Sequence, residues 1–508
     1  MSLRANLIAN YFGQGWRALM GFIFIPVYVH FLGIEAYGLV GVFAVLQAWL
    51  TLVEIGMRPT LALEMARFSA GRHNATSIRE LLRTFEIIGC AIAAAIAVVV
   101  LLASGWLSDH WLRVEKLPHS MVTHAMAAMG LVIALRLLEN LYVSAIAGLQ
   151  RQVLHNIVTS LMATIRGVGA IGVLAWVSAS AGAFFVWQGV VSVLTALILG
   201  VAVHNLLPST GVKARFSLAA IRGVWRFAAG MSAITVFALL LTQMDKIILS
   251  RMLTLTAFSY YSLAGTVTGA LYVLTGPINA AYNPRLAELA ATGDQEKLRV
   301  TYHQGAQLVS VVLGPAAVVV MVFSARLLDV WAGDPHLTSR VDPFVPVLAL
   351  GVLLNGLVNL PYQLQLAHGW TRLALQTLIL SVLVLLPAIL LLVPHYGAIS
   401  AAWCGVAMNG IFLVFNVHFM HKRLLPAERR AWYIHDVAVP LAAAFAIALV
   451  GRLLLPANSS RTIEGLQLIG LYACSAAASI LVAPVVRRRI AYSIRSSLRM
   501  PQSNVRGG

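Results

Sequence analysis

The chain has 508 residues, of which 60% are hydrophobic and only 11% are charged, and its mean hydropathy is +0.84. This composition excludes an ordinary soluble protein and indicates a membrane protein that crosses the bilayer many times. The formal charge of +18 does not indicate a nucleic-acid-binding domain, because the basic residues are dispersed through short loops between apolar segments.

Apolar segments long enough to cross a bilayer as helices follow one another along the whole chain. They predict an all-α polytopic membrane protein with about fourteen transmembrane helices, at residues 6–30, 37–57, 84–106, 122–147, 157–177, 183–205, 227–250, 257–280, 304–325, 343–366, 372–393, 397–419, 436–455 and 464–486. We expect the first segment to be retained as a span, because it is too long for the core of a signal peptide and no small-residue cleavage site follows it.

The basic residues predict which loops lie inside the cell. With a cytoplasmic N-terminus, 25 of the Lys and Arg residues fall on inner loops and the C-terminal tail, six on outer loops and five within spans. This bias predicts that both termini are cytoplasmic, and that the basic tail contacts anionic lipid headgroups. The widest loops, 58–83 inside and 326–342 outside, are too short for a soluble catalytic domain. No cofactor is expected, and a polysaccharide polymerase or ligase is disfavoured.

An internal repeat is visible at an offset of about 225 residues. Ala36-Tyr37-Gly38 begins a span that ends in Met57-Arg58-Pro59, and Phe258-Ser259-Tyr260 begins one that ends in Asn283-Pro284-Arg285. Six helices separate the copies, so the halves would be related by an axis along the membrane normal, as in many transporters. Chance similarity between apolar helices that end in basic loops is the alternative.

The glycine, cysteine and histidine residues do not indicate a nucleotide or metal site. Gly167, Gly169 and Gly172 form G-x-G-x-x-G inside the fifth span, where no strand precedes them, so we expect close helix packing rather than dinucleotide binding. No G-x-x-x-x-G-K-[ST] motif occurs, and hence no phosphate-binding loop of that type. The three cysteines and the scattered histidines indicate neither a disulfide framework nor a metal site.

Arginine side chains lie deep in three spans of the first half. Arg17 follows Asn6, Asn10 and Gln14 at spacings that place them on one helix face, and Arg136 and Arg166 lie near the middle of the fourth and fifth spans. Buried guanidinium groups predict an anionic ligand such as phosphate, held in a central lumen. The alternative is a structural ion pair, for which Arg136 and Glu139 have suitable spacing.

Other polar residues in the spans are candidates for sugar binding or ion coupling. The amides Asn279, Asn283, Asn355 and Asn359 could hydrogen-bond sugar hydroxyls or neighbouring helices. Carboxyl groups partly dried by a helix bundle could exchange protons or bind sodium. The ion-coupling candidates are Glu54, Glu139, Asp245 and Lys246, although a salt bridge or helix-end contact is the alternative for Asp245.

Several runs of residues resemble bacterial polysaccharide-lipid flippases, the O-antigen type exporters of the multidrug/oligosaccharidyl-lipid/polysaccharide exporter superfamily. The runs are Phe24-Ile25-Pro26-Val27-Tyr28, Leu32-Gly33, Glu35-Ala36-Tyr37-Gly38, Glu54-Ile55-Gly56-Met57, Glu64-Met65-Ala66-Arg67, Gln243-Met244-Asp245-Lys246-Ile247-Ile248-Leu249 and Tyr260-Tyr261.

The resemblance implies two six-helix lobes, at residues 1–210 and 211–430, two additional helices at 431–490 and a cytoplasmic tail at 491–508. It also implies a cationic lumen and translocation of undecaprenyl-pyrophosphate-linked oligosaccharide across the bacterial inner membrane. Candidate partners are the lipid-linked substrate, bilayer lipids, a polysaccharide polymerase and a chain-length regulator. The alternatives are a membrane polysaccharide polymerase or ligase and a multidrug cation exporter of the same superfamily, which would need acidic lumen residues.

Overall fold

The computed structural model describes residues 3–54, 56–209, 211, 214–217, 232–456 and 460–489, without the side chains of 3–11, 53, 232–235, 237 and 238. These ranges are helical apart from turns, short connections and an isolated bridge between Arg113 and Thr254. Within them, twelve helical segments are long and apolar enough to cross a membrane. The all-α, multi-pass fold class is therefore confirmed, whereas the count of fourteen spans is not.

The two expected spans that are not among these twelve lie next to each other in the chain. The seventh, 227–250, begins outside the described residues, and its described part belongs to α10 (Ser232–Met252), which carries Asp245 and Lys246. The eighth, 257–280, is divided by a turn at residues 270 and 271 into α11 (Leu255–Gly269) and α12 (Tyr272–Thr292).

The chain separates into two compact units. Unit 1 comprises Met1–Leu263 and Ser381–Ser400, and unit 2 comprises Ala264–Leu380 and Ala401–Gly508. Helix α17 (Thr371–Tyr396) passes from unit 2 into unit 1. The lobe boundaries expected from the sequence remain a prediction, and each unit is described below by itself.

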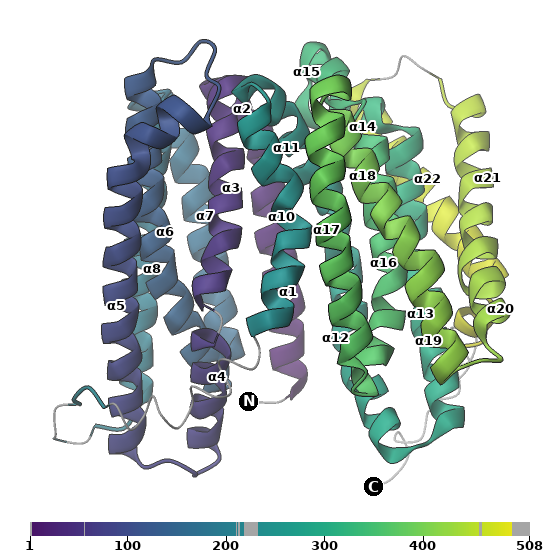
Figure 1. The fold of residues 1–508 in the computed structure, drawn as a ribbon, viewed down its shortest axis with the longest axis horizontal. Helices are drawn as coiled ribbons and strands as arrows, with labels where there is room; N and C mark the ends of the chain where they lie inside the picture. The colour runs from purple at the N-terminus through teal and green to yellow at the C-terminus, as the bar shows by residue number, and fades with distance from the viewer. Residues whose placement is uncertain are drawn as a thin grey trace, which may run out of the picture. The chain divides into compact units, whose positions relative to one another are not determined.

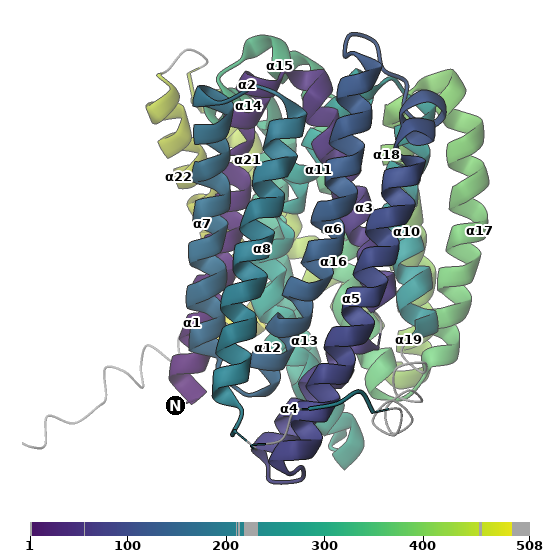
Figure 2. The same cartoon turned by 90° about the vertical axis from the view of Figure 1, so that its left-hand side faces the viewer.

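Unit 1 is a bundle in which α6 packs between α5 and α8, and α1 packs along α7 (Figures 1 and 2). Polar caps begin two of its long helices, since Asn74 accepts a hydrogen bond from the Ser77 amide and Ser180 accepts one from the Ala183 amide. Besides α10, the first part of α11 and the second part of α17, its helices are α1 (Leu3–Ile23), α2 (Ile25–Leu32), α3 (Ile34–Glu54), α4 (Met57–Ser69), α5 (Ala75–Trp106), the π-helical η1 (Leu107–Trp111), α6 (His119–Gly148), α7 (Gln152–Trp176) and α8 (Ala181–Leu206).

Glycines let helices of unit 1 approach one another closely. A Cβ atom on Gly167 would lie 2.1 Å from the Phe24 ring, and one on Gly169 would lie 2.1 Å from the Trp187 ring. The expectation that this glycine motif serves helix packing is confirmed for these two positions. Gly56, with φ of +93°, turns the chain between α3 and α4, which a residue with a side chain would do only under strain.

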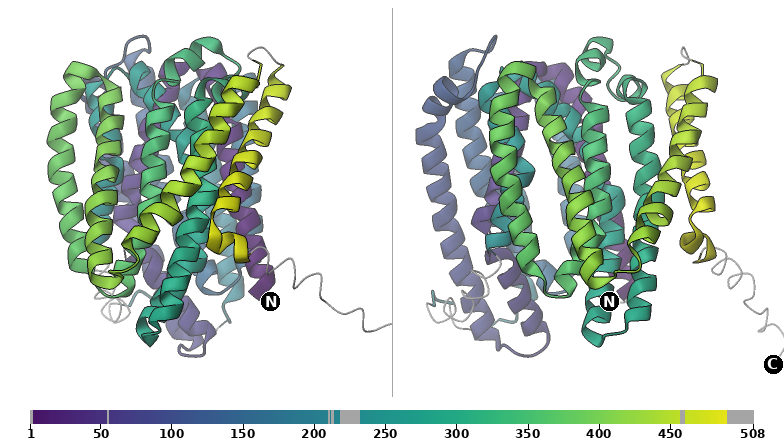
Figure 3. Two further views of the ribbon diagram at one scale, coloured as in Figure 1. Left: turned by 90° about the vertical axis from the view of Figure 1, so that its right-hand side faces the viewer. Right: turned by 45° about the vertical axis from the view of Figure 1, so that its right-hand side comes forward.

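Unit 2 is built around α13 (Gln295–Val322), which packs against α12, α16, α21 and α22. Tyr302, Leu313, Leu353 and Leu364 lie in its core and are almost fully buried. Figure 3 shows α21 and α22 side by side. The remaining helices are α14 (Ser324–Ala332), α15 (Pro335–Val341), α16 (Val345–Ala367), α18 (Ala398–Ile411), η2 (Phe412–Asn416), α19 (Val417–Leu424), α20 (Arg429–Ala431), the π-helical η3 (Trp432–Ala438), α21 (Val439–Leu454) and α22 (Arg461–Val482).

Candidate functional site: an arginine-rich cavity in unit 1

Unit 1 contains a cavity of about 590 Å³ between α1, α2, α4, α6, α7 and α8. Its charged lining consists of four arginines and one carboxylate: Arg17, Arg58, Arg136, Arg166 and Glu139. Uncharged polar and aromatic side chains complete the polar part of the wall: Tyr28, Asn140, His155, Thr159 and Gln188. The three arginines predicted from the sequence therefore line one chamber.

Arg17 is held by neutral groups of α7. Its Nη1 donates hydrogen bonds to Asn156 Oδ1 at 3.2 Å and to Thr159 Oγ1 at 2.6 Å. The preceding residue, Trp16, also contacts α7, since its Nε1 donates to Thr164 Oγ1 at 2.9 Å. These contacts orient the guanidinium group without neutralising its charge, so Arg17 stays available to an anion.

Arg166 and Glu139 form an ion pair across the wall of the cavity. Arg166 Nη2 lies 3.1 Å from Glu139 Oε2, and it also donates to Ser192 Oγ at 3.3 Å. Both side chains are largely buried, at 18% and 16% exposure. The direct ion pair of Glu139 with Arg136 considered from the sequence is not formed, because the ion-pair partner of Glu139 is Arg166 of the neighbouring helix α7. Glu139 attracts Arg136 only at longer range.

Arg136 contributes a charge whose hydrogen bonding is incomplete. Its guanidinium carbon lies 5.2 Å from the centre of the Phe43 ring, in a cation–π contact. Its Nε atom is buried and has no hydrogen-bond partner among the described residues. A buried donor without an acceptor is costly, so this guanidinium group lacks part of the hydrogen bonding that a buried cation needs.

A second ion pair anchors the cavity wall and was missed from the sequence. Arg58 Nη1 lies 3.1 Å from Glu54 Oε2, and Asn140 Nδ2 donates to Glu54 Oε1 at 2.7 Å. The hydropathy pattern predicts an inner loop from residue 58, but Arg58 is in the first turn of α4. The spacing of four residues between Glu54 and Arg58 was the signal that could have identified the pair. Glu54, a predicted ion-coupling residue, is 4% exposed and is neutralised here.

The other predicted residues of unit 1 lie elsewhere. Gln14 is exposed on α1 and is not part of the cavity lining, while the side chains of Asn6 and Asn10 lie outside the described part of the structure. Asp245 accepts a hydrogen bond from the Tyr261 hydroxyl at 2.6 Å. Lys246 is half-buried on α10. The structure thus brings Arg17, Arg136, Arg166 and Glu139 together, and separates Gln14 from them.

The four predicted amides belong to unit 2 and do not line this cavity. Asn355 donates to Asn409 Oδ1 at 3.1 Å and accepts from the Tyr272 hydroxyl at 3.3 Å, so it joins helices. Three of the amides have buried carbonyl oxygens without a hydrogen-bond partner among the described residues: Asn279, Asn283 and Asn359.

The charge distribution defines what the cavity can bind. Within the described part of the chain, Arg58 and Arg166 form ion pairs with carboxylates, whereas Arg17 and Arg136 form none. Two cations therefore face the chamber without a carboxylate partner. Since charges removed from water need compensation, the arrangement suits a ligand with two negative charges.

Comparisons with known proteins identify the family of the chain. Residues 27–341 match the family model of polysaccharide biosynthesis proteins. A Shigella flexneri protein named as an O-antigen transporter is 21% identical over 407 residues, covering 79% of this chain and 94% of that protein. The lipopolysaccharide biosynthesis protein WzxC of Escherichia coli strain K12 is 24% identical over 220 residues, covering 43% of this chain and 44% of that protein.

Solved structures share the fold. The lipid II flippase MurJ in an inward closed conformation aligns with a TM-score of 0.67 and 12% identity, covering 94% of this chain and 98% of that one. An inward-facing MATE family multidrug resistance transporter of the MOP superfamily aligns with a TM-score of 0.64 and 12% identity, covering 80% and 96%. At this identity, the likeness establishes the fold alone.

Proposed function

Because the chain belongs to the family of polysaccharide biosynthesis proteins, we propose that it is a flippase for undecaprenyl-pyrophosphate-linked oligosaccharide. It moves these units from the cytoplasmic to the outer leaflet by alternating access, for surface polysaccharide biosynthesis. The observation that supports the proposal most strongly is the arginine-rich cavity of unit 1, with its two cations free of carboxylate partners.

The substrate matches the cavity in charge and in hydrogen bonding. A pyrophosphate that joins a lipid to a sugar is a diester with two negative charges, and Arg17 and Arg136 supply two positive ones. Guanidinium groups stay charged and offer paired donors to phosphate oxygens. A hydrogen bond to a charged group contributes about 1.5–3 kcal/mol, so each arginine has a measurable share of the affinity.

The membrane potential supplies a direction for the movement. A potential that is negative inside favours outward transfer of an anion by about 2.3 kcal/mol per charge per 100 mV. The arginines reduce this contribution while the substrate is bound, but the same field draws the empty cationic carrier back inward. This cycle requires no nucleotide hydrolysis.

The flippase works in the bacterial inner membrane, with both termini cytoplasmic, and it catalyses no change in covalent bonds. The named activities of its relatives, O-antigen transport and lipid II flipping, support a transporter rather than an enzyme. A polysaccharide polymerase and a chain-length regulator are candidate partners, since they would act on the units that it delivers.

A cation exporter is disfavoured by the charge of the same cavity. MATE transporters share the fold, but a cationic drug in this chamber would meet four arginines and one carboxylate. Like charges at close range in a poorly hydrated site repel strongly. A polymerase or ligase would instead join sugars and would not need to move the lipid.

Transport in a defined bilayer tests the proposal. The purified chain is reconstituted into vesicles that carry undecaprenyl-pyrophosphate-linked oligosaccharide on one leaflet, and arrival on the other leaflet is measured with a sugar-binding lectin. We expect protein-dependent transfer of this lipid and none of a cationic dye. Transfer of the dye alone, or elongation of the sugar without transfer, would overturn the proposal.

A further inference from the structure

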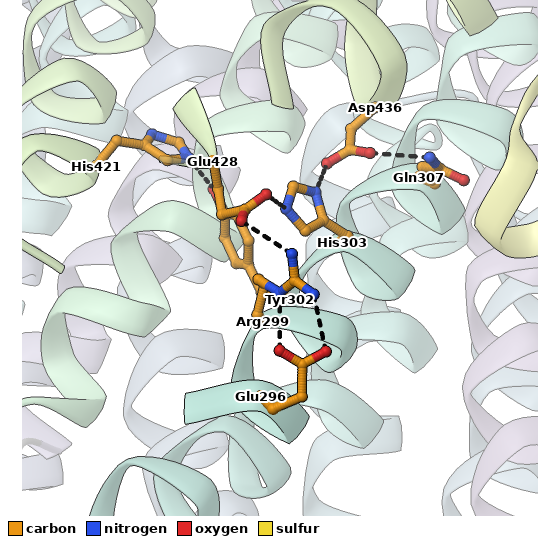
Figure 4. A network of polar contacts seen from close by, with 8 residues as sticks. All are labelled: Glu296, Arg299, Tyr302, His303, Gln307, His421, Glu428 and Asp436. Atoms are coloured by element: carbon orange, nitrogen blue, oxygen red, sulfur yellow. Dashed lines mark hydrogen bonds and ion pairs between the residues drawn. The ribbon is translucent and has the colours of Figure 1, made fainter. Parts of the chain in front are cut away.

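Unit 2 contains a second buried polar cluster, centred on His303 of α13. Its ring contacts two carboxylates at once: Nδ1 makes a short contact with Asp436 Oδ2, and Nε2 lies 3.0 Å from Glu428 Oε2 (Figure 4). Asp436 lies on the π-helical segment η3, and Glu428 lies just before α20. The three side chains are mostly withdrawn from solvent, at 11% exposure for His303, 15% for Glu428 and 2% for Asp436.

Counting hydrogen-bond donors fixes the number of protons in this cluster. A neutral imidazole has one N–H donor and one acceptor nitrogen, whereas an ionised carboxylate only accepts. Both ring nitrogens of His303 face carboxylate oxygens, so a neutral ring would set an acceptor against an acceptor. These two hydrogen bonds therefore require one proton more than a neutral ring and two ionised carboxylates contain.

The surroundings assign that proton to the ring. Glu428 Oε1 accepts from Arg299 Nη1 at 3.2 Å, and Asp436 Oδ1 accepts from Gln307 Nε2 at 2.9 Å. These donors stabilise both carboxylates as anions. Burial raises the pKa of Glu428, but hydrogen bonds from Arg299 and His303 outweigh it and hold this pKa below its ordinary value. His303 is then an imidazolium with two charged acceptors.

The balance of charge strengthens this assignment. Arg299 is shared between Glu428 and Glu296, to which it donates from Nε and Nη2. With His303 protonated, the five side chains carry one excess negative charge, and without the proton they carry two. Arg488 and Arg489 line the same cavity but form no ion pair with these carboxylates among the described residues, so a protonated His303 is the cation in direct contact with Asp436.

A neighbouring histidine provides the contrasting case. His421 Nδ1 lies 2.9 Å from the carbonyl oxygen of Val417, which can only accept, so this nitrogen carries a proton. His421 Nε2 lies 3.2 Å from the Tyr302 hydroxyl and accepts from it. A neutral ring therefore satisfies every contact of His421, and no extra proton is required.

Protons can reach His303 through a cavity of about 670 Å³ that it lines. The other groups that can titrate or carry charge in this wall are Arg299, Glu428, His435, Asp436, Arg488 and Arg489. Gln307 links the cluster to a third segment, because its Oε1 accepts from the backbone amides of Val485 and Val486 at 3.0 and 3.3 Å. The cluster thus joins α13 to η3 and to the residues after α22.

We propose that His303 is a proton-binding site of unit 2, which ties α13 to the segment Glu428–Ala438 while it holds its proton and loosens that tie on losing it. The site is separate from the arginine-rich cavity of unit 1. The inference is independent of the substrate proposed for that cavity.

Histidine NMR of the full chain in lipid nanodiscs tests proton binding directly. With ¹⁵N-labelled histidine, and with signals assigned by His303→Gln and His421→Gln, we expect His303 to carry protons on both ring nitrogens at neutral pH. We expect His421 to carry one, on Nδ1. A neutral His303 ring at neutral pH would overturn the proposal.

Carboxamide variants test the cause. In Glu428→Gln or Asp436→Asn, the new amide can donate to a neutral ring, so His303 should lose its proton at a pH lower by on the order of one unit than in the unmodified chain. Either variant suffices if the other does not fold. Identical His303 titrations in the unmodified chain and in a folded variant would contradict the proposed role of the carboxylates.

Amide hydrogen exchange tests the tie between the elements. Protection of residues 428–438, normalised to that of α6 in unit 1, should fall several-fold as His303 loses its proton in the unmodified chain. The Glu428→Gln variant should show no such change over the same pH range, because its His303 ring is already neutral and its hydrogen bonds are satisfied. Constant protection of this segment through the His303 titration would refute the tie.

Discussion

The arginine-rich cavity of unit 1 and the His303 cluster of unit 2 differ in the sign of their excess charge. Both contain charged side chains between apolar helices. Arginines exceed carboxylates in the lining of the first, whereas in the bonded cluster of the second three carboxylates, Glu296, Glu428 and Asp436, exceed the one arginine that contacts them, Arg299. Each excess attracts a ligand of opposite sign. The imbalance within a buried cluster, rather than its total charge, therefore supports the ligands that we propose: a dianion in unit 1 and a proton in unit 2.

The largest effect is expected from removing an unpaired cation of unit 1. Arg136→Gln should lower transport of the lipid-linked oligosaccharide about tenfold or more, because a charged hydrogen bond contributes about 1.5–3 kcal/mol and 1.4 kcal/mol corresponds to tenfold. The vesicle assay measures it. Arg151→Gln, an exposed arginine of the same unit outside the cavity, is the matched control and should transport normally. Equal transport by both variants would show that Arg136 does not hold the substrate.

Breaking the ion pair between Arg166 and Glu139 should affect the stability of the protein more than substrate binding. Arg166→Gln leaves Glu139 without its partner in a largely buried position, which should lower the free energy of unfolding by about 1–3 kcal/mol. The double variant with Glu139→Gln should regain most of that loss. Thermal unfolding of the purified variants checks this, and a double variant no more stable than the single one would count against the pair.

A glycine substitution tests how Arg17 is positioned. A Cβ atom on Gly13 would lie 2.3 Å from Asn156 Oδ1, the oxygen that accepts from Arg17. Gly13→Ala should therefore cost about 1–3 kcal/mol and reduce transport by moving this acceptor. Gly15→Ala on the same helix has open space around its Cβ and serves as the control. Comparable stability and transport in both variants would show that the close approach of α1 and α7 is unimportant.

The smallest effect concerns the amides of unit 2. Asn359→Leu removes a buried carbonyl oxygen that has no hydrogen-bond partner among the described residues. If this amide contacts sugar, transport of the oligosaccharide-bearing lipid should fall about threefold, the loss of one neutral hydrogen bond, with no change for undecaprenyl pyrophosphate alone. A uniform loss for both lipids would indicate a structural role instead.

The positions of the cavity arginines could be predicted because their chemistry conflicts with their surroundings. Arg17, Arg136 and Arg166 lie too deep in apolar spans to reach water along the bilayer normal, so they had to face a polar interior. Helix periodicity was less informative. Gln14 lies three residues before Arg17, but on a helix this separates the two directions by about 60°, and the structure leaves Gln14 exposed.

The partners of these residues could not be predicted, because they are set by contacts between helices. Spacing within one helix favoured Arg136 for Glu139, but Arg166 of the next helix is its ion-pair partner. The hydropathy pattern predicts a loop at Arg58, because the turn at Gly56 that begins α4 leaves no signal in it. In the His303 cluster, His303 contacts Asp436, which is 133 positions away, and no local motif in the sequence indicates this contact.

Equilibrium binding tests the central claim, that two unpaired arginines of unit 1 recognise a pyrophosphate, most directly. Affinities for undecaprenyl pyrophosphate and undecaprenyl monophosphate, each capped with a sugar so that they carry two and one negative charges, and for tetraphenylphosphonium are compared for the full chain in nanodiscs and for the Arg17→Gln/Arg136→Gln variant. The account predicts that the pyrophosphate binds most tightly and the cation most weakly, and that the double variant loses the preference for pyrophosphate over monophosphate. Preferential binding of the cation, or an unchanged preference in the double variant, would contradict it.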